Sequence, residues 1–218
     1  MGKITKLLLL ISLIISFSAC VTKAFLSADN ILYYKGKLSA EANNNLMNLY
    51  ERACIKPRLL RIKSSGGDVF LGLDLGDWVF KNKLNIEVID YCLSSCANYV
   101  FTAGEAKLLN PNSALVWHGG SLQADLLNES NKEFILGWRE REKLFFKKIG
   151  VEQKITIYGQ ELPYKQNCSD CIGFDYSIDD MKKMGLKNII ELKTDWNWRR
   201  YHKGLRAFRV NLDLVSYY

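Results

Sequence analysis

Ser95 and His118 are the residues whose types and positions favour nucleophilic chemistry in this chain. Ser95 opens a stretch of small and apolar residues with helical character, and His118 ends an apolar run just before two glycines. A serine hydroxyl is a weak nucleophile until a base removes its proton, and a neutral imidazole can do this near neutral pH. A carboxylate would then orient the imidazole and stabilise its charged form.

Both residues also have plainer explanations. A serine at a helix start is commonly an N-cap, and the adjacent Ser94 competes for that role. A single histidine is commonly structural. The positions still favour chemistry, because amides at a helix N-terminus stabilise developing negative charge. Loops at the ends of parallel strands also gather into a crevice, which is where His118 is expected.

A glycine pair, Gly66-Gly67, ends the expected strand 58–63. Two glycines directly after a strand allow the backbone to turn with positive φ or to approach another group closely. The segment is not a phosphate-binding loop, because the spaced glycines and the lysine of that motif are absent. Taken alone, a glycine pair indicates only a turn.

Apolar periodicity predicts alternating strands and helices that surround these residues. The expected strands are 31–37, 58–63, 85–90, 108–109, 114–117 and 189–192, and the expected helices are 39–53, 68–81, 95–103, 132–148 and 178–184. This order is typical of an α/β fold with mostly parallel pairing. A chain of 218 residues suggests a single domain with short extensions.

Three stretches resemble the Clp-type serine peptidases of the Clp/crotonase superfamily. "IKSSGGDVFLGLDLGDWV" is similar to their glycine loop and following helix, "CLSSCANYVFTAG…LNPNSALVWHGG" to their nucleophile segment and histidine, and "YSIDDMKKMGL" to a late helix. The resemblance covers 31–192 and is nearest to exported members with a C-x-S-A-C motif. It implies superhelical ββα units with a mostly parallel sheet over 29–195.

Matched by position, the resemblance implies that Ser95 is the nucleophile and His118 the base. It further implies that the amides of Gly67 and Cys96 form the oxyanion hole. One departure is Ser65, which stands where the family usually has proline.

The position of the triad acid departs from the pattern of the family. Counting back from the late helix places it near Gly173, which cannot serve. Asp170 and Asp175 flank that position. Asp175 is two residues from Gly173, so in a strand its side chain would point to the same side as that of the expected acid. Asp170, in the loop closed by Cys168 and Cys171, would need only a small shift of that loop, and we favour it very slightly.

The first 20 residues have the features of an export signal. Lys3 and Lys6 precede an apolar run at 7–17 that is too short to span a membrane comfortably. The ending "FSAC" resembles the bacterial lipobox, although Phe17 replaces the usual leucine. We therefore expect a signal peptide at 1–19, a lipid-anchored Cys20, a linker at 20–28, and a place on the periplasmic or extracellular face of the cell envelope. The alternative is ordinary cleavage after Ala24.

Export would permit disulfides among the five remaining cysteines, at 54, 92, 96, 168 and 171. An odd number cannot pair completely within one chain. The Cys168-Ser-Asp-Cys171 segment predicts a local disulfide, because a zinc site would need a second ligand pair with suitable spacing. The full connectivity stays open.

The net charge of +7 is not gathered into a run of like charges, which argues against nucleic-acid binding. We expect no metal and no organic cofactor. The aromatic residues of helix 132–148 fit either a homo-oligomer contact, as the resemblance implies, or core packing. The basic aromatic segment 196–218 is expected to pack on the domain, with contact to anionic lipid headgroups as the alternative.

The sequence thus favours an exported, lipid-anchored serine hydrolase, most simply a peptidase acting on a peptide or protein substrate. An acyl-CoA enzyme of the crotonase type is disfavoured, because CoA chemistry is cytosolic. The alternative from another class is a non-catalytic envelope lipoprotein that uses the same fold as a binding or assembly module.

Overall fold

The computed structural model describes residues 23–215 apart from 124–125, 129 and 163. Its strands are β1 Lys23–Leu26, β2 Leu32–Lys35, β3 Leu59–Ser64, β4 Asn85–Leu93, β5 Lys107–Leu109, β6 Ala114–Val116, β7 Phe174–Tyr176, β8 Ile189–Glu191 and β9 Phe208–Val210. Its helices are α1 Ala40–Arg52, α2 Val69–Lys81, α3 Lys132–Ile149 and α4 Ile178–Lys183, with the π-helix η1 Cys96–Phe101 and the 3-10 turns η3 Gln153–Thr156, η4 Tyr158–Gln160, η5 Trp198–Arg200 and η6 Leu212–Val215.

Seven strands form the main sheet in the order β1-β2-β3-β4-β5-β8, with β6 paired to β4. β1 pairs antiparallel to β2, and the other described pairs of this sheet are parallel. Strand β4 is long enough to pair with β5 near its start and with β6 at its end. The expected α/β class with a mostly parallel sheet is confirmed.

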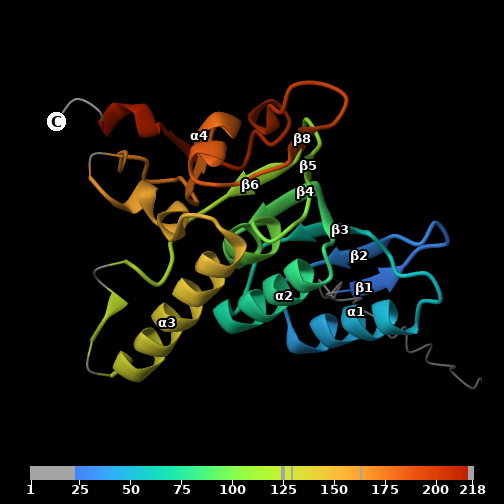
Figure 1. Cartoon of the computed structure of the whole chain (residues 1–218). Helices are drawn as coiled ribbons and strands as arrows, with labels where there is room; N and C mark the ends of the chain where they lie inside the picture. Colours follow the sequence, from blue (N-terminus) through green and yellow to red (C-terminus); the bar gives the residue numbers. More distant parts are fainter. Residues whose placement is uncertain (1–22, 124–125, 129, 163, 216–218) are drawn as a thin grey trace, which may run out of the picture.

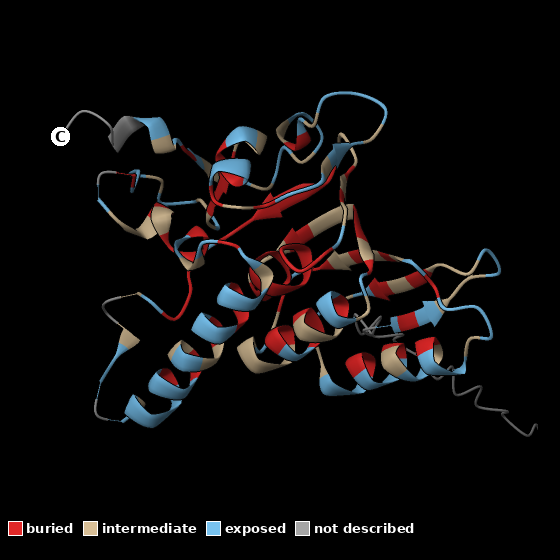
Figure 2. Cartoon of the chain, in the orientation of Figure 1, coloured by how far each residue is buried: buried red, intermediate tan, exposed pale blue. Residues whose placement is uncertain are grey.

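Helices α1, α2 and α3 lie side by side on one side of the sheet (Figure 1). α1 contacts β1 and β2, α2 contacts η1, and α3 packs on α2, while the outer faces of these helices are exposed (Figure 2). Local signals fix the helix starts: the Ser39 side chain accepts a hydrogen bond from the amide of Ala42, and Asp68 accepts from the amides of Phe70 and Leu71. These caps lie within a residue of the starts that the sequence predicts.

Strand β1 lies inside the segment 20–28 that the sequence analysis treats as a linker. Ala24 is buried there, and Phe25 stacks on Tyr33 of β2 with ring centroids 4.7 Å apart. A strand of four residues is too short to show a clear alternation of apolar and polar side chains in the sequence. Only its pairing with β2 in the structure identifies it as a strand. The predicted signal peptide 1–19 and the lipidation site Cys20 lie outside the described residues. In the described ranges, no helix is both long and apolar enough for a membrane span.

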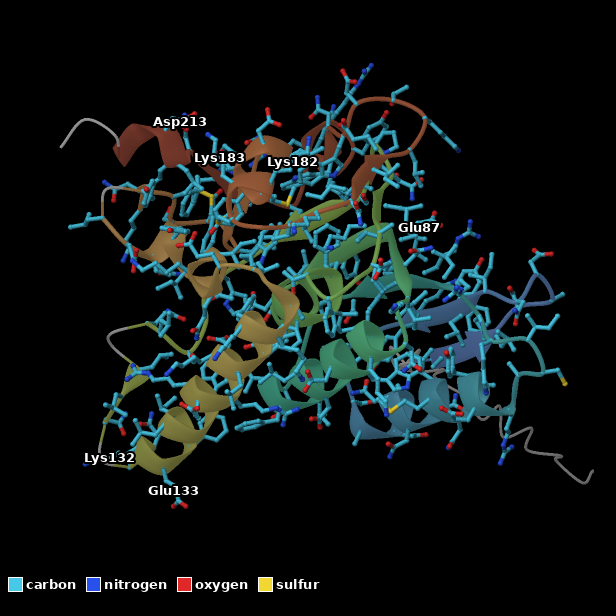
Figure 3. All side chains as sticks on the ribbon, viewed as in Figure 1. Glu87, Lys132, Glu133, Lys182, Lys183 and Asp213 are labelled. Carbon is cyan, nitrogen blue, oxygen red and sulfur yellow. A yellow bond between two sulfur atoms is a disulfide. The ribbon has the colours of Figure 1, made fainter. Side chains whose placement is uncertain are left out.

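The last part of the chain packs on the domain through a second, two-stranded sheet. β9 pairs parallel to β7, and Trp198 is buried. Lys183 at the end of α4 forms an ion pair with Asp213 at 2.6 Å, and both are labelled at the edge of the molecule in Figure 3. Residues far apart in sequence therefore hold the C-terminal segment in place.

Candidate functional site

Ser94 occupies a sharp turn between β4 and the π-helix η1. Its φ is +57°, a left-handed conformation that costs a non-glycine residue about 1–2 kcal/mol. The turn is fixed from both sides, because the Ser94 amide donates to Val116 O at 3.0 Å and the amide of Asn98 donates to Ser94 O at 2.8 Å. An i→i+5 helix directly after a strained residue is an arrangement found often at functional sites.

His118 lies just beyond β6, where the chain leaves the sheet. Its Nε2 atom is 2.6 Å from Ser94 Oγ, a hydrogen-bond distance. The backbone at this point is held by paired hydrogen bonds between Trp117 and Phe174, and the side chain of Gln160 donates to His118 O at 2.7 Å. The half-buried serine and the exposed imidazole thus face one another across the ends of two parallel strands.

The serine that meets His118 is not the one the sequence analysis assigns. Ser95 is only 2% exposed, and its hydroxyl donates to Gly67 O at 2.9 Å. The left-handed turn at Ser94 directs two consecutive side chains to different places, the first toward the imidazole and the second into the interior. Ser95 therefore fastens the glycine loop to the turn. The signal that could have identified Ser94 is its central place between Cys92 and Cys96.

The glycine pair lies close against this turn. Gly66 has φ +81°, and a Cβ atom there would lie 2.6 Å from Leu93 O and 2.8 Å from Ser94 Cβ. A Cβ atom at Gly67 would lie 2.8 Å from Leu38 O. Only glycine permits the loop after β3 to approach both neighbours so closely.

A cavity of about 430 Å³ opens where these elements meet. It is lined by Lys37, Ser65, Gly66, Gly67, Leu93, Ser94, Val116, His118 and Ile172. Gly67, one of the two oxyanion donors that the resemblance implies, belongs to this lining, whereas Cys96 is fully buried one residue beyond Ser95. The lining combines a hydroxyl, an imidazole and glycine backbone with apolar side chains.

The buried side chain of Glu142 on α3 holds both the loop after His118, through Ser121, and η1, through Tyr99. Glu142 is fully buried and accepts hydrogen bonds from the Tyr99 hydroxyl at 2.6 Å and from Ser121 Oγ at 2.5 Å. Burial, reinforced by the negative charge of Glu142, raises the pKa of Tyr99 well above its ordinary value. Tyr99 therefore remains a protonated donor across the physiological range.

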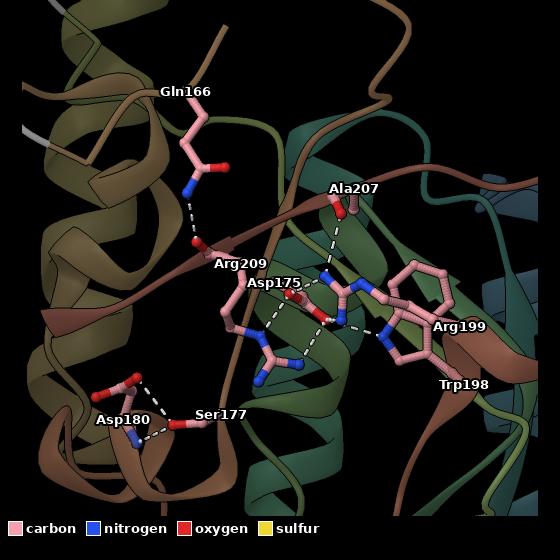
Figure 4. A network of polar contacts seen from close by, with 8 residues as sticks. All are labelled: Gln166, Asp175, Ser177, Asp180, Trp198, Arg199, Ala207 and Arg209. Carbon is pink, nitrogen blue, oxygen red and sulfur yellow. Dashed lines mark hydrogen bonds and ion pairs between the residues drawn. The ribbon is translucent and has the colours of Figure 1, made fainter. Parts of the chain in front are cut away.

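Neither predicted acid contacts His118. Asp175 is fully buried between two guanidinium groups: Arg199 donates at 2.6 and 2.7 Å and Arg209 at 2.8 and 3.1 Å (Figure 4). Trp198 Nε1 donates to the same carboxylate at 2.9 Å. Asp175 therefore holds the C-terminal segment to β7.

Asp170 is exposed and forms an ion pair with Arg206. Among the described residues, no carboxylate forms a hydrogen bond to the His118 ring. Gly173 lies against the start of the His118 side chain: a Cβ atom added there would lie 3.0 Å from His118 Cβ and 2.1 Å from Trp117 O. The place that the resemblance assigns to the acid is thus next to His118 but is occupied by glycine.

The five cysteines that the structure describes form two local disulfides, Cys92–Cys96 and Cys168–Cys171, and leave Cys54 free and exposed. Ligand atoms of Cys168, Asp170 and Cys171 lie within 4.8 Å of one another. Both sulfur atoms of that group are bonded to each other in the disulfide, and a cysteine binds a metal ion as a thiolate, so the group does not fit a metal ion in this state.

A scan against protein-family models and a search of curated proteins found no match to this chain.

Proposed function

We propose that this chain is an exported, lipid-anchored serine hydrolase, most simply a peptidase, in which Ser94 is the nucleophile and His118 the general base. The observation that carries this proposal is the 2.6 Å contact between Ser94 Oγ and His118 Nε2 at the wall of a cavity. The left-handed turn supports it, because strain at a half-buried serine needs a reason beyond packing. The parallel α/β sheet is compatible with the Clp/crotonase superhelix, which we include in the proposal.

In the proposed reaction, His118 takes the Ser94 proton as Oγ bonds to a substrate carbonyl carbon. The tetrahedral oxyanion would lie against main-chain amides, for which we propose Gly67 and Ser95. Gly67 lines the cavity, and Ser95 begins the helical turn whose first amides have no intrahelical partner. His118 then returns the proton to the leaving group as its bond to carbon breaks. Water, deprotonated by His118, then bonds to the acyl carbon, and His118 returns that proton to Ser94 Oγ as the bond between Oγ and the acyl carbon breaks.

The dyad has no described carboxylate behind the imidazole. Losing the orienting acid of a serine triad slows turnover by about 10⁴-fold while leaving the nucleophile and base in place. We therefore expect slow hydrolysis with detectable covalent reaction at Ser94. The same feature, Gly173 in place of an acid, is the observation that favours the alternative, a non-catalytic envelope lipoprotein that binds or assembles through this cavity.

A fluorophosphonate probe tests the proposal, since it needs only an activated serine. The wild type should be labelled at about pH 7.5, the Ser94→Ala variant should not, and His118→Ala should be labelled far more slowly. Ser95→Ala is the matched control one residue away and should keep its label, with a reduced rate because Gly67 O loses its donor. A folded wild type that takes no label would support the binding module instead. Mass spectrometry of the N-terminus tests lipidation separately.

A further inference from the structure

The disulfide Cys92–Cys96 encloses the proposed nucleophile. Ser94 lies two residues from each cysteine, and the two Cα atoms are 5.3 Å apart. Cys92 belongs to the last part of β4, Cys96 is the first residue of η1, and both are fully buried. The bond therefore closes a five-residue loop with Ser94 at its apex.

The conformation at that apex must be imposed, because a serine does not favour φ near +57° by itself. Two backbone hydrogen bonds and the close approach of Gly66 support the turn. The disulfide adds a covalent limit, because it stops the end of β4 and the start of η1 from separating. A separation would allow Ser94 to relax to negative φ and would move Oγ away from His118.

We propose that the Cys92–Cys96 disulfide is a positioning element that keeps Ser94 in its left-handed turn opposite His118, so that reactivity at Ser94 requires the oxidised bond. This inference rests on the proposed function for its catalytic consequence. Its structural part concerns the Ser94–His118 contact alone and can be tested without any reaction.

Reduction would reverse the effect by ordinary thiol–disulfide exchange. A dithiol reductant supplies two electrons and two protons, the Sγ–Sγ bond breaks, Cys92 and Cys96 become thiols, and the reductant becomes a disulfide. Because both sulfur atoms are buried, exchange needs local opening of the turn first. The bond is therefore expected to be reduced slowly in the folded protein.

The second disulfide, Cys168–Cys171, provides a control, since it closes a loop of similar length that does not contain the serine, although the adjacent Ile172 lines the same cavity. The Cys92→Ala/Cys96→Ala variant should react with the fluorophosphonate about tenfold more slowly than the wild type. A rate loss of about tenfold corresponds to the cost of about 1–2 kcal/mol for holding a non-glycine residue in the left-handed conformation, which the disulfide would no longer help to offset. The Cys168→Ala/Cys171→Ala variant should stay within about twofold. Circular dichroism and thermal melting verify that both variants are folded.

The same cysteine substitutions made in a His118→Ala protein distinguish a positioning role of the disulfide from a general loss of rigidity around Ser94. If the disulfide acts through the Ser94–His118 pair, removing it in a His118→Ala protein should change the residual labelling rate little, because the contact that it maintains is already absent. An equal tenfold loss in both backgrounds would overturn the proposal.

Histidine NMR gives a readout that does not depend on activity, because the chain has only two histidines. The His118 ring nitrogens should report a hydrogen bond to Ser94 in the wild type and in Cys168→Ala/Cys171→Ala, and lose it in Cys92→Ala/Cys96→Ala. His202, whose Nε2 is 2.7 Å from Asn112 O, serves as the internal reference. Unchanged His118 signals in the disulfide variant would overturn the inference.

The possible outcomes are distinguishable. A wild type that is not labelled contradicts the proposed function, and the NMR comparison then decides the positioning claim by itself. If the alanine pair does not fold, wild-type protein in graded glutathione buffers replaces it. Labelling and the His118 signal should then follow the oxidised fraction of Cys92–Cys96 measured by mass spectrometry. Full reactivity in the folded, reduced protein would contradict the proposal.

Discussion

Asp175→Asn tests the role that the structure gives to the buried carboxylate. The substitution keeps the size of the side chain and removes its charge. Asp175 accepts four hydrogen bonds from two arginines and one from the indole of Trp198. These donors all belong to the C-terminal segment, so the loss should act on the attachment of residues 196–210 to β7.

The expected cost follows from burial. Removing one partner of a buried ion pair destabilises a protein by about 3–5 kcal/mol, because the opposite charge is left uncompensated. The side chains of Arg199 and Arg209 are 37% and 41% exposed and can regain water, which favours the lower end, about 3 kcal/mol. For a protein of this size, this corresponds to a melting temperature lower by about 6–12 °C.

Urea denaturation and thermal melting measure this change, and Asp170→Asn is the matched control. Asp170 and its partner Arg206 have side chains 54% and 62% exposed, and exposed pairs contribute about 0–1 kcal/mol. Limited proteolysis should also cut the C-terminal segment sooner in Asp175→Asn than in the wild type. Labelling at Ser94 should be retained by the folded fraction of both variants, since neither carboxylate contacts His118.

Two results would refute this reasoning. A stability change below about 1 kcal/mol for Asp175→Asn would show that the carboxylate is not a structural anchor. A folded Asp170→Asn protein that has lost its labelling would show that Asp170 is the acid after all, reached by a movement of the Cys168–Cys171 loop.

Two further perturbations test the glycine loop and a buried lysine. Gly66→Ala should destabilise the protein by more than about 1 kcal/mol and slow labelling, because φ is +81° and the added Cβ atom would lie 2.6 Å from Leu93 O; wild-type melting and labelling would contradict this. Burial lowers the pKa of Lys107 to about 8, below its ordinary value near 10.4, so the unfolded chain binds more protons between these values. The cost of the buried charge is therefore fully present below about pH 8 and is lost as the pH rises toward 10.4. Over this range the free energy of unfolding of the wild type should rise relative to that of Lys107→Met, and parallel pH profiles of the two proteins would contradict the assignment.

The sequence by itself determined the order and type of most elements. Apolar periodicity, the caps at Ser39 and Asp68 and the break at Gly66-Gly67 are local signals, and they place α1, α2, β3 and β4 within a few residues of their observed bounds. The same signals placed His118 at the end of a strand, just before the break at Gly119-Gly120. Short edge strands such as β1 and β9 lacked such a signal, because their pairing depends on partners elsewhere in the chain.

Only the tertiary structure decided which side chains meet. The choice between Ser94 and Ser95 depends on one φ angle, and that angle is set by Val116 O, by the approach of Gly66 and by the Cys92–Cys96 bond. Asp175 is bound by arginines 24 and 34 residues further along the chain, a contact that no local pattern encodes. Side-chain direction at a sharp turn, and the pairing of buried charges, are consequences of long-range packing rather than of neighbouring residues.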